Sequence, residues 1–95
     1  MFNHFEVSDH WVPIVEEMVR KLYAIDPAIE FLQIKEKFGQ LRVYYRGSGN
    51  ERVDEIIRQA EHECSYTCEV CGAKDATLTT VKGWIGVRCL RHEVE

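Results

Sequence analysis

The stretch Cys68-Glu69-Val70-Cys71-Gly72 is followed by Cys89-Leu90-Arg91-His92, with 17 residues between Cys71 and Cys89, which gives the C-terminal third the pattern C-x2-C-x17-C-x2-H. A gap of two residues lets both side chains of a pair reach the same ion, and tetrahedral Zn²⁺ takes thiolate and imidazole ligands at structural sites. Gly72 suits the tight turn after the first pair, because glycine adopts positive φ at little cost. The pattern predicts one structural Zn²⁺ per chain, bound by Cys68, Cys71, Cys89 and His92.

Other interpretations of these cysteines fit the sequence less well. A thioredoxin-like redox pair needs its first cysteine at the start of a helix in a βαβ unit, and structural disulfides are disfavoured in a reducing compartment. A zinc deaminase needs an H-x-E motif well upstream of its C-x-x-C pair, whereas Glu61-His62-Glu63 has a different order and lies close to Cys68. Cys64 remains an alternative ligand, although a buried thiol on a helix is the favoured interpretation.

A β-hairpin is predicted between the two ligand pairs. Thr77–Val81 and Trp84–Arg88 have the composition of short strands, and Lys82-Gly83 forms the turn between them. The C-terminal third therefore has the pattern of a zinc-finger or zinc-ribbon-like hairpin. Trp84 is expected to pack over this hairpin, and its alternative role is an exposed anchor for a partner.

Upstream of the metal-ligand pattern, residues 11–25 have apolar side chains with the spacing of an amphipathic helix. Ser8 or Asp9 is a candidate N-cap for this helix, because both side chains can accept a hydrogen bond from a free backbone amide. Pro13 is tolerated in the first turn, and Asp26-Pro27 is expected to end the helix.

The next segment predicts an antiparallel β-hairpin. Residues 31–36 and Gln40–Arg46 alternate in polarity, and the short connection between them contains Gly39. In this pattern Leu32 and Ile34 face the core. The outer face then carries a basic and aromatic group formed by Lys35, Arg42, Tyr44 and Arg46. The solvated face of an α/β layer is the favoured interpretation, and a nucleic-acid contact through charge and stacking is the alternative.

A second helix is predicted after the connection Gly47-Ser48-Gly49-Asn50, in which Ser48 or Asn50 can act as the N-cap. One face of this helix is apolar and consists of Val53, Ile56, Ile57, Ala60 and Cys64. The predicted fold class is α+β: helix, β-hairpin, helix, then the C-terminal zinc-binding hairpin. We expect a single domain, 1–95, made of an α-β-β-α layer (1–66) and a zinc-binding module (67–95).

Length and composition restrict the class of protein. A chain of 95 residues has room for one domain, and 45% hydrophobic residues are too many for intrinsic disorder. Residues 1–6 lack the basic start and apolar stretch of a signal peptide. No apolar run approaches the ~18 residues of a membrane span. We therefore expect a cytoplasmic protein without a membrane contact.

The net charge of −4 is unevenly distributed: it is −4 over residues 1–30, +2 over residues 31–60 and −2 over residues 61–95. A general phosphate binder is expected to be basic overall. An acidic chain is better suited to occupying the nucleic-acid-binding surface of another protein.

Two resemblances extend this interpretation. The motifs Thr67-Cys68-Glu69-Val70-Cys71-Gly72 and Arg88-Cys89-Leu90-Arg91-His92 resemble the zinc finger of the DksA/TraR family of RNA-polymerase-binding regulators. His92 stands where that family typically has cysteine, and the family's long coiled-coil hairpin is missing, so insertion into a polymerase channel is not implied.

Over roughly residues 11–92 the chain also resembles small phage and bacterial proteins. The similarity rests on the run IKEKFGQLRVY that begins at Ile34, on Ala60-Glu61, on the first cysteine pair and on Gly83-Trp84. This resemblance implies a zinc-bearing α/β fold and a phage or prophage origin.

The sequence contains no pattern that predicts catalysis, and we do not expect an enzyme. Gly47-Ser48-Gly49 is too short for a phosphate loop and lacks its lysine.

We expect a small zinc-stabilised protein-binding module, a phage-type inhibitor or regulator of a host protein or ribonucleoprotein complex. A defence nuclease and the transcription machinery are natural targets. The chain is expected to act as a monomer or homodimer. The alternative is a nucleic-acid-binding zinc-finger protein. Candidate partner contacts are Lys35, Arg42, Tyr44, Arg46, Glu16, Glu17 and Trp84.

Overall fold

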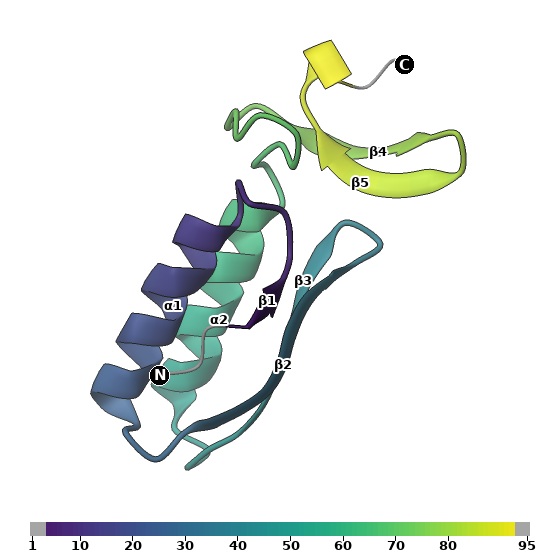
Figure 1. Ribbon diagram of the computed structural model, residues 1–95. Helices are drawn as coiled ribbons and strands as arrows, with labels where there is room; N and C mark the ends of the chain where they lie inside the picture. The colour runs from purple at the N-terminus through teal and green to yellow at the C-terminus, as the bar shows by residue number, and fades with distance from the viewer. Residues whose placement is uncertain (1–3, 93–95) are drawn as a thin grey trace.

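Two helices lie side by side on one face of a three-stranded sheet, and a separate two-stranded sheet lies beyond one end of this layer (Figure 1). The computed structural model describes residues 4–92, so residues 1–3 and 93–95, at the limits of the predicted domain, lie outside the description. The elements in chain order are β1 Phe5–Glu6, α1 Val12–Ile25, β2 Glu30–Lys37, β3 Gln40–Arg46, α2 Glu51–Cys64, β4 Thr77–Val81, β5 Trp84–Arg88 and the short 3-10 helix η1 Leu90–His92. This confirms the predicted α+β class.

In the described part of the chain, no helix has both the length and the apolar character needed to cross a membrane.

The apolar stripe of α1 faces the core, as its spacing predicts, but the predicted N-cap is wrong. Trp11 is the N-cap residue, and its side chain makes no capping hydrogen bond to the described residues. The second residue of the helix is Pro13, which has no N–H to be capped. The Ser8 hydroxyl instead donates to the carbonyl of Glu69, 61 residues away in the chain. Asp9 contributes only its backbone carbonyl, which accepts from Val12.

The β2–β3 hairpin forms as predicted, but a β-bulge changes which residues of β2 face inward. Phe31 pairs with Tyr45 and Gln33 pairs with Tyr44, so Leu32 is the extra residue on β2. The bulge moves Phe31 into the core, where it is 6% exposed, and leaves Leu32 51% exposed. The prediction that Leu32 faces the core is therefore wrong, because strict alternation fails where one strand gains a residue.

Strand β1 is too short for periodicity to reveal. Phe5 and Glu6 pair in parallel with Ile34 and Lys35 of β2, which gives the sheet the order β1-β2-β3. β2 is thus the central strand, and β3 forms one edge of the sheet.

Helix α2 begins at Glu51 with Asn50 as its N-cap, and the Asn50 side chain accepts a hydrogen bond from the amide of Arg52 at 2.8 Å. Of the two predicted caps, Asn50 is therefore confirmed. Ser48 instead donates its backbone amide to the carboxylate of Asp26, which ties the connection to the end of α1.

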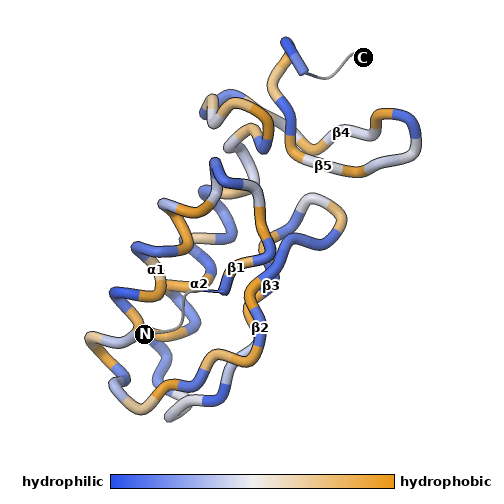
Figure 2. Tube along the Cα trace, in the orientation of Figure 1, coloured by the Kyte–Doolittle hydropathy of each residue, from blue (hydrophilic) through white to orange (hydrophobic). Residues whose placement is uncertain are grey.

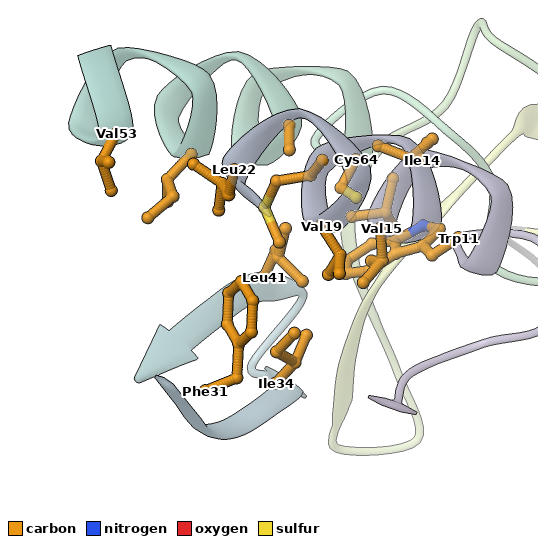
Figure 3. Packing of buried hydrophobic residues seen from close by; sticks show 14 of the residues in the cluster. Trp11, Ile14, Val15, Val19, Leu22, Phe31, Ile34, Leu41, Val53 and Cys64 are labelled. Carbon is orange, nitrogen blue, oxygen red and sulfur yellow. The ribbon is translucent and has the colours of Figure 1, made fainter. Parts of the chain in front are cut away.

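The core lies between the two helices and the inner face of the sheet (Figure 3). Apolar positions recur along both helices in Figure 2 and alternate with hydrophilic ones, as one-sided burial requires. The same buried cluster includes Trp11, Cys64, Cys68, Val87 and Cys89. The apolar core is therefore continuous from the helical layer to the residues of the predicted metal site.

Candidate metal centre

The first cysteine pair lies in a tight turn shortly after the end of α2. The amide of Cys68 donates to the carbonyl of Ala73 at 2.8 Å, and the amide of Gly72 donates to the carbonyl of Cys68 at 2.9 Å. Gly72 has φ +81°, and a Cβ there would lie 3.2 Å from Nδ1 of His10. The amide of Val70 also points at the Cys68 Sγ, at 3.4 Å. Glycine and these amides together hold both thiols on the inside of the turn.

The second pair follows strand β5. Cys89 comes directly after Arg88, the last residue of β5, and the chain then enters η1. The amide of His92 donates to the carbonyl of Cys89 at 2.9 Å. This single helical turn brings the His92 imidazole back beside the Cys89 thiol.

The structure brings Cys68, Cys71, Cys89 and His92 together, with their four donor atoms within 4.8 Å of one another. The Cys71 and Cys89 sulfur atoms are 3.7 Å apart. His92 Nδ1 lies 3.7 Å from the Cys68 sulfur and 3.3 Å from the Cys89 sulfur. Tetrahedral Zn²⁺, with Zn–S of about 2.3 Å and Zn–N of about 2.0–2.1 Å, requires sulfur–sulfur separations of about 3.8 Å and sulfur–nitrogen separations of about 3.6 Å. Three of the separations are close to these values, and the four side chains could therefore bind a metal ion.

The environment of Cys68 and Cys71 favours thiolate, which is the form that binds a metal. The amide of Ala73 and the Arg91 guanidinium, 3.5 Å from the Cys71 sulfur, lower the pKa of Cys71 to about 7. Burial opposes ionisation of Cys68, but the amides of Cys89 and Val70 outweigh it, and the pKa of Cys68 falls below its usual value. Burial and the neighbouring Cys71 raise the pKa of Cys89. A bound divalent cation would offset the unfavourable interaction between adjacent thiolates and so favour ionisation of Cys89.

Cys64 is not part of this group of four. It is fully buried in the core on α2, and burial raises the pKa of its thiol to about 12. The alternative in which Cys64 replaces His92 is not supported by the geometry, because His92 already lies beside Cys68 and Cys89.

Sequence reasoning missed the contacts that attach the metal-binding turn to the rest of the fold. Trp11 Nε1 donates to the carbonyl of Thr67 at 2.9 Å in the buried interior. Glu69, between the first two cysteines, accepts from the amide of Val87 at 2.6 Å and donates its own amide to the Val87 carbonyl at 2.9 Å. These partners are far apart in the chain, and no local pattern signals them.

The predicted basic and aromatic residues of the β2–β3 hairpin do not form one continuous positive surface. Lys35 is paired with Arg42 in the register of the two strands. Arg46 forms an ion pair with Glu30 at 3.4 Å, and the Glu30 carboxylate offsets the positive potential of Arg46. Tyr44 is 43% exposed. Lys35, Arg42 and Tyr44 therefore remain available to a ligand, whereas Arg46 is paired with an acidic side chain.

The other predicted contact residues lie at separate places. Glu16 and Glu17 are exposed on α1, where Glu17 pairs with Arg20. Trp84 is 76% exposed at the end of the β4–β5 hairpin. The expectation that Trp84 packs over the hairpin is therefore wrong, because a residue beside the turn of an isolated two-stranded sheet has no second layer to cover it.

Comparisons with protein-family models, with curated proteins and with solved structures found no match to this chain, so the metal centre is interpreted from its own geometry.

Proposed function

We propose that Cys68, Cys71, Cys89 and His92 bind one structural Zn²⁺, and that the chain is a small zinc-stabilised protein-binding module without enzymatic activity. The observation that carries the zinc assignment is the close grouping of three sulfur atoms and one imidazole nitrogen. Zn²⁺ suits this donor set best among common divalent ions, and four protein ligands leave no open coordination position for catalysis. The ion would stabilise a hairpin that has little apolar core of its own.

Native mass spectrometry and elemental analysis of protein purified without added metal test this assignment. The expected result is one zinc per chain, and the same spectra report whether the chain is a monomer or a homodimer. Cys68→Ser and Cys89→Ser should lose the metal, whereas Cys64→Ser should keep it. A metal-free chain, or one that is two mass units lighter because of a Cys68–Cys71 disulfide, would overturn the assignment.

The β4–β5 hairpin supports the proposed binding role. Leu78, Trp84 and Ile85 are 56%, 76% and 40% exposed, and Leu90 beyond the hairpin is 81% exposed. By the register of β4 and β5, Leu78 and Ile85 lie on one face of the hairpin and Trp84 lies on the other. Trp84 is the strongest candidate contact, because tryptophan is enriched among the residues that dominate binding energy. We take this hairpin as the contact with a protein partner.

The resemblance to small phage and prophage proteins supports a more specific proposal. The partner would belong to a host protein or ribonucleoprotein complex, such as a defence nuclease or the transcription machinery, and the chain would inhibit or regulate it. Binding of a purified candidate complex to the zinc-loaded chain tests this. Trp84→Ala should weaken binding at least tenfold, whereas Leu32→Ala, which removes an apolar side chain 51% exposed on the sheet, should not. Equal effects of both variants would exclude the hairpin as the contact.

A further inference from the structure

A hollow of about 520 Å³ lies where the edge strand β3 meets the C-terminal half of α2. Helix α2 contributes Arg58, Glu61 and His62, and its C-cap residue Ser65 continues the same face, with the spacing i, i+3, i+4, i+7. Gly39, Gln40 and Arg42 line the other side. The hollow is polar and distinct from both the metal-binding residues and the apolar residues of the β4–β5 hairpin.

The charges of the two arginines in this hollow are offset only in part, by the single carboxylate of Glu61. Neither Arg42 nor Arg58 forms an ion pair within 4.0 Å with any residue from 4 to 92. Arg42 donates one guanidinium nitrogen to the Gln40 side chain at 2.8 Å. Its Nε is the only buried side-chain polar atom in residues 4–92 that lacks a hydrogen-bond partner. A buried donor without an acceptor is unfavourable, and because Nε itself is covered, a ligand would have to contact the terminal guanidinium nitrogens of Arg42.

Glu61 is the single carboxylate in the hollow, and its environment disfavours its charge. Burial raises the pKa of Glu61, while Arg42 and Arg58 oppose this shift only in part. Two guanidinium groups therefore line the same hollow as one carboxyl group, which belongs to an exposed residue. The hollow has a net positive charge in a protein whose total charge is −4.

Exposed aromatic rings flank Arg42 along the hairpin. Phe38, in the β2–β3 turn next to Gly39, is 62% exposed, and Lys37 lies over its ring at 5.8 Å. Tyr44 lies two residues beyond Arg42 on the same side of β3 and is 43% exposed. Cationic groups combined with exposed rings are typical of surfaces that bind single-stranded nucleic acids, because phosphates pair with arginine and bases stack on aromatic faces.

We propose that this hollow binds a phosphate group of a single-stranded nucleic acid, with Arg42 and Arg58 as the phosphate ligands and Phe38 and Tyr44 as stacking surfaces. The contact adds to the proposed protein-binding function and does not depend on it. A ribonucleoprotein partner would offer surfaces for both.

Fluorescence anisotropy with a labelled 12-nucleotide single strand, DNA or RNA, at 50 mM salt tests the proposal on zinc-loaded protein. Arg58→Gln and Arg42→Gln should each weaken binding about tenfold, because each removes one charge-assisted contact. Glu61→Gln should strengthen binding by removing the competing carboxylate. Arg52→Gln, on the same helix but outside the hollow, is the matched control and should leave affinity unchanged. Affinity should fall steeply as salt rises, and the slope should be smaller in Arg58→Gln.

Three outcomes would overturn the proposal. The first is no binding at 50 mM salt, and the second is equal weakening by Arg52→Gln and Arg58→Gln. The third is that inorganic phosphate or a nucleoside monophosphate binds in the hollow and the oligonucleotide does not. The last would assign the hollow to a small phosphate ester. Zinc content and thermal unfolding, measured on every variant, separate loss of this contact from failure of the metal site. Because Arg58 is exposed, its variant is expected to fold even if Arg42→Gln does not.

Discussion

Cys64 and Cys68 lie four residues apart, and both are fully buried, yet their thiols have different chemistry. Cys68 receives backbone amides and lies beside His92, which lowers its pKa. Cys64 faces apolar neighbours in the core, and burial raises its pKa to about 12. Backbone hydrogen-bond donors therefore outweigh burial at Cys68, whereas burial dominates at Cys64, and this difference assigns the two thiols to metal binding and to packing.

We expect Cys64→Ser to keep the metal and lower the free energy of unfolding by about 1–3 kcal/mol, because it places a hydroxyl in the apolar core. Chemical denaturation together with elemental analysis measures both effects. Loss of zinc from this variant would show that Cys64 is a ligand and that the set of four is wrong.

The raised pKa of Cys64 also makes stability depend on pH. The thiol ionises near its ordinary value of 9.0 in the unfolded chain but near 12 in the folded protein. Its contribution to stability is therefore complete below pH ~9 and is lost as the pH rises toward 12, by about 1.4 kcal/mol per pH unit. Cys64→Ala, which cannot ionise, is the control: the stability of the wild type relative to this variant should fall between pH 9 and 11. A constant difference would contradict the prediction.

At the scale of the elements, the two helices begin in different ways. Helix α2 has a side-chain cap, whereas α1 is entered through a turn in which the Trp11 amide donates to the Ser8 carbonyl at 2.9 Å. The start of α2 depends on one local residue, Asn50. The start of α1 depends on contacts that the Ser8 and Trp11 side chains make with the metal-binding turn. The start of α1 is thus coupled to the C-terminal third, and α2 contacts that third at its last turn, where Glu63 forms an ion pair with Lys74.

Asn50→Ala should lower the free energy of unfolding by about 1 kcal/mol, because the amide of Arg52 loses its acceptor. Ser48→Ala is the matched control: the bond from Ser48 to Asp26 uses the backbone amide, so this variant should change stability by less than about 0.5 kcal/mol. Urea denaturation of both proteins measures the difference. A larger effect of Ser48→Ala would restore Ser48 as the cap.

The β2–β3 turn supports the second sheet through close contact. Gly39 has φ +78°, and a Cβ there would lie 2.3 Å from the Leu78 Cδ1 and 3.4 Å from the Gly86 Cα. Gly49 has a similar φ of +80° but open space around it. Gly49→Ala therefore isolates the backbone cost, about 1–2 kcal/mol. Gly39→Ala should cost only slightly more, by less than about 1 kcal/mol, because Leu78 Cδ1 is the end of a flexible side chain that is 56% exposed and can shift. Thermal unfolding compares the two variants, and a much larger loss in Gly39→Ala would show that Leu78 cannot move away.

At the scale of the whole molecule, the metal site and the helical layer share one core. Cys68 and Cys89 belong to the same buried cluster as Trp11 and Leu22. The helical layer also contacts the metal-binding turn through polar bonds from Ser8 and Trp11. Metal binding is therefore expected to stabilise the start of α1 as well as the C-terminal hairpin.

Chelation tests this coupling, because the chain has two tryptophans with opposite exposure: Trp11 is fully buried and Trp84 is 76% exposed. In a Trp84→Phe variant, Trp11 is the source of all the tryptophan fluorescence. Removal of the metal should shift its emission to longer wavelength as water reaches the indole. Unchanged emission, with zinc loss verified by elemental analysis, would show that the helical layer is independent of the metal. The complementary variant Trp11→Phe should show little change, since Trp84 is already in water.

Local patterns in the sequence determined both helices, both hairpins, the α+β class and the four residues that meet at the candidate metal site. Each of these features is signalled by residues within about seven positions of one another in the sequence, or by the two-residue gap within a ligand pair. Tertiary structure alone decided the parallel pairing of β1, the bulge that turns Phe31 inward and the exposure of Trp84. It also decided that Arg42 and Arg58 line the same hollow. These features depend on contacts between segments far apart in the chain. A two-residue strand, one inserted residue or an uncovered hairpin leaves no periodic signal, because the free energy that selects each comes from packing and hydrogen bonds formed only after the elements assemble.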